Sequence, residues 1–193
     1  MSTTMRAARV RTVSRRVDAR RANAQLHALG AGRFIHVNGS LERHLHGTQQ
    51  LLRGWGGRDA LCLAGLYHAV YGTDGIIGRL VGLEARRTIA EVIGEEAERL
   101  VYLYGACDRE RFHPRIGTPL QQRFVDRFAA SEYAIAEAQL RDFCELTVAN
   151  ELDLALQSPR FRLRHGVELS RLFARMGPLL SDAARSAVCE VLQ

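Results

Sequence analysis

The stretch Leu61–Gly75, LCLAGLYHAVYGTDG, decides the fold of this chain. Its apolar residues recur at helical spacing and form one stripe that would face a core: Leu63, Leu66, Tyr67 and Val70. One polar residue, His68, lies beside that stripe, and its helical neighbours include Ala64, Gly65 and Gly72. Because small neighbours leave room around an imidazole, we interpret His68 as part of an internal polar site.

The segments around this stretch predict further helices, separated by glycine, proline and serine signals. We expect helices over residues 18–29, 41–55, 58–72, 83–93, 95–106, 131–157, 161–176 and 181–192. No alternating pattern of useful length indicates a strand. The sequence therefore predicts an all-α, compact bundle of about eight helices, in which residues 107–119 form a loop or lid at the edge of the site.

Composition indicates a globular chain, since 47% of the 193 residues are hydrophobic and 25% are charged. No run reaches the roughly 18 apolar residues of a membrane span. Arginines recur through residues 6–21, where a secretory signal would be apolar, so we expect a cytoplasmic protein without a membrane partner.

The positive charge is concentrated at the N-terminus. Residues 1–33 contain eight arginines and one aspartate, a charge of +7, so the total of +6 leaves −1 for the remainder. We expect residues 1–17 to be a flexible basic arm and residues 18–193 to be one domain. Nucleic-acid contact is then expected to be weak and limited to the arm.

Two residue counts exclude whole classes of chemistry. The chain has no lysine, which rules out a Schiff-base lysine, a pyridoxal phosphate anchor and a phosphate-loop lysine. Its four cysteines are scattered without a CxxC pair, which indicates thiols of a reducing compartment rather than zinc ligands or disulfides.

Two further polar residues are expected to meet His68. On the helix that Ser40 would cap, His44 flanks an apolar stripe and has Gly47 one turn later, whereas His46 points roughly 200° away. In the long helix, Asn150 shares a core-facing side and needs a buried hydrogen-bond partner, which a histidine from another helix would supply.

The order of four motifs, HVNGSLERHLHGT, AGLYHAVYGT, IGEEAERLV and VANELDLA, resembles the HD-domain superfamily, above all its alarmone-hydrolase branch. The resemblance covers roughly residues 33–157, and the segments HLHGT and AGLYHAVYGT also resemble an uncharacterised family of bacterial HD-like domains. It implies an HD-like helical fold. It also implies that His44 and His68 match metal-binding histidines of that superfamily.

The chain departs from the HD pattern at two acidic positions. Ala69 stands where the His-Asp pair has its aspartate, and Asn150 stands where the late helix has another. The resemblance implies one or two metal ions that activate water, but hard cations prefer the lost carboxylates. A remaining metal would be one divalent transition ion, Fe, Mn or Zn, on His44 and His68, with Asp74, Asp108, Glu145 or Asp153 supplying a displaced carboxylate.

Three functions remain open at this stage. The first is a hydrolase, or an HD-type iron oxygenase, acting on a small and anionic metabolite. The second is a metal-free acid–base enzyme, such as a cyclase, isomerase or lyase, in which His44, His68, Asn150 and Tyr71 do the chemistry. The third is a non-catalytic module that binds a ligand or partner, with a homodimer through the last two helices as one arrangement. Four residues are expected to contact the substrate: His36, Ser40, Arg111 and Arg115.

Overall fold

A computed structural model describes residues 19–36, 39–75 and 78–192, and it confirms the all-α prediction. The described residues form nine α-helices: α1 (Ala19–Ala28), α2 (Leu41–Gly54), α3 (Asp59–Tyr67), α4 (Arg86–Ile93), α5 (Glu95–Ala106), α6 (Arg109–Phe112), α7 (Glu137–Gln157), α8 (Pro159–Met176) and α9 (Asp182–Leu192). Short 3-10 turns occupy Ala31–Arg33, Leu83–Ala85, His113–Arg115 and Gly177–Leu179. The expected arm, residues 1–17, lies outside the described residues.

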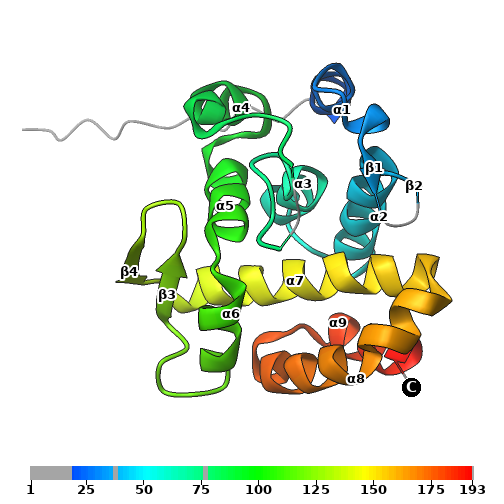
Figure 1. Cartoon of the computed structure of the whole chain (residues 1–193), viewed down its shortest axis with the longest axis vertical. Helices are drawn as coiled ribbons and strands as arrows, with labels where there is room; N and C mark the ends of the chain where they lie inside the picture. The colour runs from blue at the N-terminus through cyan, green and yellow to red at the C-terminus, as the bar shows by residue number, and fades with distance from the viewer. Residues whose placement is uncertain (1–18, 37–38, 76–77, 193) are drawn as a thin grey trace, which may run out of the picture.

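Helix α7 is the axis of the molecule (Figure 1). It runs between α2, α3 and α5 on one side and α8 and α9 on the other, and it contacts all five. Residues 143–150 are buried without a break, so α7 presents no face to water along two turns. A helix buried all round belongs to the centre of a fold. Polar residues such as Asn150 are therefore held inside the protein.

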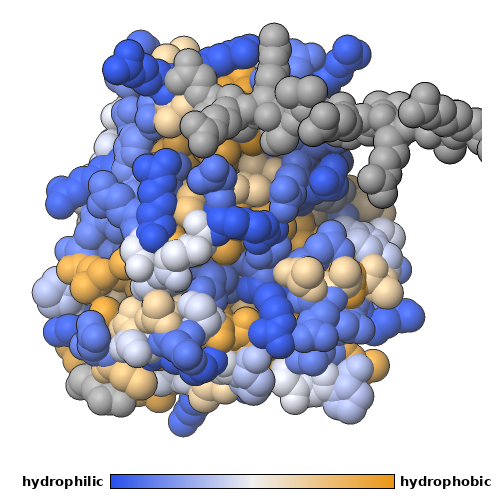
Figure 2. Space-filling model, turned by 180° about the vertical axis from the view of Figure 1, so that it is seen from behind, coloured by the Kyte–Doolittle hydropathy of each residue, from blue (hydrophilic) through white to orange (hydrophobic). Residues whose placement is uncertain are grey.

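Hydrophilic residues cover most of the face that Figure 2 shows, with smaller apolar patches between them. None of the helices that the structure describes is long and apolar enough to cross a bilayer.

The long helix begins later than expected, because residues 131–134 form a strand instead. Strand β4 (Ser131–Ala134) pairs in antiparallel register with β3 (Arg123–Asp126). At the turn, Asp126 Oδ1 accepts hydrogen bonds from the backbone N–H groups of Phe128 and Ala129. The prediction that the chain lacks strands was therefore wrong for this hairpin and for a two-residue pair, β1 (Ile35–His36) with β2 (Gly39–Ser40).

Two expected elements near the site also differ. Helix α3 ends at Tyr67, so His68 occupies its C-cap and the following residues form turns rather than a helix to 72. Residues 107–119 are not a simple loop, because Asp108 caps α6 and the side chains of Phe112 and Ile116 are fully buried. This segment is anchored in the core through those two side chains.

Candidate functional site

A cavity of about 370 Å³ lies where the end of α3 meets α2, α6, α7 and α8. The two predicted histidines, His44 and His68, both line it, together with Asn150. The imidazole centroids of His44 and His68 are 5.2 Å apart and the ring planes are nearly perpendicular, at 88°. Both side chains are buried, and within the described structure this cavity is the space that the two rings share.

His44 is held between two residues of α7. Its Nδ1 lies 2.6 Å from Asp153 Oδ2, and its Nε2 lies 2.9 Å from Asn150 Oδ1. Asp153 is itself buried and also accepts a hydrogen bond from Gln157 Nε2 at 2.6 Å. Since a carboxylate and an amide oxygen both accept, each nitrogen of the His44 ring faces an acceptor.

The Asn150 amide is oriented by its neighbour on α7. Its Nδ2 donates to Glu151 Oε1 at 2.9 Å, and Arg109 Nη1 lies 3.5 Å from the same oxygen. A reversed amide would place Oδ1 against the Glu151 carboxylate, where two acceptors repel each other. The arrangement therefore presents the Asn150 oxygen, not its nitrogen, to His44.

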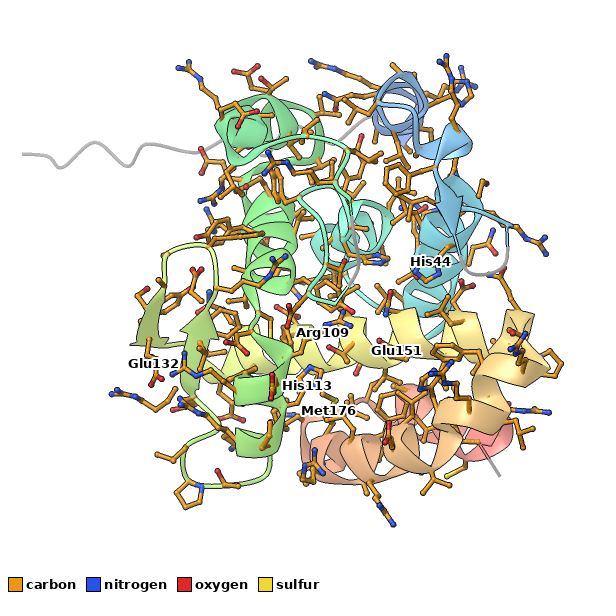
Figure 3. The ribbon with its side chains drawn as sticks, viewed as in Figure 1. His44, Arg109, His113, Glu132, Glu151 and Met176 are labelled. Carbon is orange, nitrogen blue, oxygen red and sulfur yellow. The ribbon has the colours of Figure 1, made fainter. Side chains whose placement is uncertain are left out.

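Arg109 brings a positive charge to the cavity wall. Its backbone N–H donates to Asp74 Oδ2 at 2.9 Å and its Nη2 donates to Tyr104 Oη at 2.9 Å. Burial acts to lower the pKa of Arg109, but Tyr104 and Glu151 more than offset this, so the pKa is raised. Figure 3 shows Arg109 and Glu151 beside α7, with His44 on α2 above them. The cavity wall therefore carries a positive charge at Arg109.

His68 makes a different contact from His44. Its Nδ1 lies 2.8 Å from the carbonyl oxygen of Gly65, one turn earlier in α3. A carbonyl oxygen only accepts, so Nδ1 carries the hydrogen. On its other side the ring meets Tyr104, with centroids 5.4 Å apart.

The glycines near His44 and His68 make room for groups other than the imidazole rings. A Cβ at Gly47 would lie 1.8 Å from Asp153 Oδ1, and a Cβ at Gly65 would lie 2.6 Å from Leu52 Cδ1. Gly47 therefore makes room for the carboxylate that holds His44, and Gly65 lets α3 approach α2. At Gly72 the φ angle is +82°, a backbone conformation that glycine adopts readily.

Tyr71 is not at the cavity, contrary to expectation. Its hydroxyl donates to Glu98 Oε1 at 3.1 Å, and Arg86 pairs with both oxygens of the same carboxylate. Burial and the Glu98 charge raise the pKa of Tyr71. The structure therefore places this tyrosine in a buried polar cluster between α4 and α5.

The expected substrate-binding residues are dispersed. Arg111 and Arg115 both pair with Glu132 on β4 and do not line the cavity. Ser40 accepts a hydrogen bond from the Arg43 backbone as the N-cap of α2. The backbone of His36 pairs with Gly39, and its side chain lies outside what the structure describes.

The residues at the cavity do not fit the metal centre that the HD resemblance implies. Among the described residues, no three His, Cys, Asp or Glu side chains gather closely enough to hold a metal ion. The two nitrogens of His44 already meet Asp153 and Asn150. The carboxylates nearby are already engaged, because Asp74 and Glu151 contact Arg109 and Asp153 contacts His44. None of them is left to replace the lost HD carboxylates as a metal ligand.

Sequence reasoning missed Arg109 and Glu151 as site residues, and it named Asp153 only as a metal ligand. Arg109 lies in a segment read as a loop, and Glu151 follows Asn150 on α7 like many solvent-facing acids. No spacing in the sequence distinguishes them. The one available signal was Asp153, which lies three residues after Asn150 and shares its helical face.

Comparison with known proteins adds a partial match. Residues 25–109 match the model of a family described as a domain of unknown function, DUF6817, which is less than half of the chain. The matched segment contains His44, His68 and Arg109 but none of the α7 residues at the cavity. No curated protein and no solved structure matches the chain.

Proposed function

We propose that this protein is a metal-independent acid–base enzyme that acts on a small, anionic metabolite. The observation that carries the proposal is that two buried histidines line one cavity, His44 with an acceptor at each ring nitrogen and His68 with an acceptor at Nδ1. One ring is bounded by acceptors at both nitrogens, and the other donates Nδ1–H to a carbonyl. Such a pair can give and take a proton at one substrate.

His44 is the proposed general acid. With Asp153 accepting at Nδ1 and Asn150 Oδ1 accepting at Nε2, both ring nitrogens are placed as hydrogen-bond donors. The buried Asp153 carboxylate supplies the balancing charge. A substrate oxygen that displaces the Asn150 contact would receive the Nε2 proton, and Asp153 would stay in place behind the ring.

His68 is the proposed general base. Because its Nδ1–H donates to the Gly65 carbonyl, the neutral ring carries its lone pair on Nε2. Hydrolysis is the reaction we favour for this pair. In it His68 takes a proton from water as the water attacks, while His44 gives a proton to the leaving group.

The charges at the cavity favour an anionic substrate. Arg109 lines the wall, and Arg79 lines the cavity as an exposed residue that forms no ion pair within the described part of the chain. Apolar side chains such as Phe34, Leu154 and Phe161 cover other parts of the cavity surface. A small molecule with one anionic group and one apolar part would match both surfaces.

An HD-like origin is part of this proposal. Ala69 and Asn150, which stand at the two lost acidic positions of the HD pattern, both line the same cavity as His44 and His68. Their positions support the view that an ancestral metal pocket was kept while its carboxylates were replaced. Hydrolysis is the common activity of the HD superfamily, and we favour it for this protein by analogy.

Turnover of a metabolite extract tests the proposal. The purified protein, treated with a chelator, is incubated with small-molecule extract, and substrate loss and product gain are followed by mass spectrometry. We expect anionic compounds to be converted, with the conversion lost in His44→Gln and His68→Gln. His46→Gln is the matched control, because His46 lies on the same helix but does not line the cavity, and it should keep full activity.

Two other results would contradict the proposal. If the chelator removes activity and added Mn²⁺ or Fe²⁺ restores it, the metal-dependent alternative holds. If compounds bind without being converted, and binding needs the same histidines, the protein is a binding module.

A further inference from the structure

Helix α8 carries an exposed apolar stripe that the proposed enzyme site does not use. Leu163 is 87% exposed and Val167 is 67% exposed. Ser170 and Ala174 of α8 and its C-cap Gly177 follow at alternating spacings of three and four residues. That alternation keeps all five positions on one face of a helix and is typical of helix-to-helix packing.

The stripe leads into a groove between α8 and α9. Its volume is about 350 Å³, and α8 contributes Ser170, Phe173 and Ala174 while α9 contributes Val188 and Leu192. The lining is mostly apolar, with Arg185 as the charged exception. This groove is separate from the histidine cavity, which meets α8 through Phe161 and His165.

A row of arginines flanks the stripe. Four exposed arginines of α8 lie next to the stripe on the helical wheel: Arg160, Arg164, Arg171 and Arg175. In the structure as described, none of them pairs with a carboxylate, and Glu168 is the one acidic residue of the helix. The arginines lie on one side of the stripe and the groove on the other. Such a surface calls for an apolar partner face with negative charge along one edge.

We propose that the α8–α9 groove binds an acidic amphipathic helix of another protein. The apolar face of that helix would cover Leu163 and Val167 and enter the groove, and its carboxylates would meet the α8 arginines. A second copy docking through the same face would place those arginines against each other, which disfavours self-association. The first 18 residues of the chain are arginine-rich, so their charge also disfavours them as the occupant.

The test uses two synthetic peptides and fluorescence anisotropy. Each fluorescein-labelled 18-residue peptide has leucines at spacings of three and four, with glutamate at the other positions in one and lysine in the other. We expect the glutamate peptide to bind, with a Kd that rises with salt, and the lysine peptide not to bind. Val167→Ser combined with Arg171→Glu should raise the Kd roughly tenfold or more, because central contacts dominate such interfaces.

Matched surface changes elsewhere serve as controls. Leu120→Ser and Arg87→Glu alter an exposed leucine and an exposed arginine outside α8 and α9, and they should leave the Kd unchanged. Equal binding of both peptides, or an unchanged Kd in the α8 variant, would overturn the proposal. So would sedimentation showing a dimer that Val167→Ser dissociates, or binding to phosphatidylserine vesicles that the α8 variant abolishes while the peptide fails to bind.

Discussion

Replacing Gly47 by alanine should disturb the acid–base site without altering any group that touches the cavity. The added Cβ would lie 1.8 Å from Asp153 Oδ1 and 2.6 Å from its Cγ, so the buried carboxylate has to move. Moving it breaks the contact with His44 Nδ1 and the hydrogen bond from Gln157, each 2.6 Å long.

The expected cost follows from those two contacts. A hydrogen bond to a charged group contributes about 1.5–3 kcal/mol. Against that loss, alanine gains about 0.5–1 kcal/mol over glycine inside a helix. The two contacts together contribute about 3–6 kcal/mol, so we expect Gly47→Ala to lower the free energy of unfolding by about 2–5 kcal/mol and to reduce turnover together with it.

Urea unfolding measures this directly, and the chain offers a matched control. Gly166 lies in the middle of α8, where an added Cβ meets no heavy atom within 4 Å, so Gly166→Ala should raise stability by about 0.5–1 kcal/mol. In an Asp153→Ala background the cost of Gly47→Ala should largely vanish, because the clashing group is gone. If Gly47→Ala is as stable as Gly166→Ala, the described packing of α2 on α7 is incorrect.

Three other predictions concern the rest of the fold. Burial and the charges of Arg109 and Arg175 lower the pKa of His113 from 6.5 to about 4, so the unfolded chain binds this proton more readily. The contribution of His113 to the free energy of unfolding should be complete above pH 6.5 and should fall by up to about 3 kcal/mol as the pH falls towards 4. In urea titrations, His113→Gln should remove this pH dependence. Glu98→Gln should cost about 1–2 kcal/mol in the same assay, because Arg86, whose side chain is partly exposed, loses its pairing with the buried carboxylate. A thiol reagent should label only Cys189 in the native protein and all four cysteines after unfolding, and fast labelling of Cys107 would contradict the described burial.

The helical part of the fold was readable from the sequence because its signals are local. Glycines and prolines separate the helices: α4 ends before Gly94, and α5 begins at its acidic start, Glu95. The two hairpins were missed because strands of two and four residues are too short for a period-two pattern. The start of α7 was predicted too early for the same reason. Residues 131–134, expected in the helix, belong to strand β4.

The site was predicted in part. Small neighbours and a core-facing amide indicated that His44, His68 and Asn150 belong together, and the structure brings them to one cavity. We expected the glycines to leave room for the imidazole rings, which is only partly correct, because Gly47 makes room for Asp153 instead. Such a contact joins residues 106 positions apart in the chain, and helical spacing within one segment cannot show it.

The arginine residues show the same limit. Arg111 and Arg115 were expected at the substrate because they lie on a proline-bounded segment, whereas Arg109, two positions earlier, is the one that lines the cavity. The difference arises because Arg109 is held at the cavity by its hydrogen bonds to Asp74 and Tyr104, while Glu132 on β4 pairs with the other two arginines. Arg111 and Arg115 are therefore held away from the cavity by a contact with β4 that local sequence cannot show.

The most direct test of the central claim is nitrogen-15 NMR of the imidazole rings of His44 and His68, assigned with His44→Gln and His68→Gln. We predict that both nitrogens of His44 carry a hydrogen, because each faces an acceptor oxygen. In His68, Nδ1 should be protonated and Nε2 should not. If His44 instead has one unprotonated nitrogen, or His68 carries protons on both, the assignment of acid and base is contradicted.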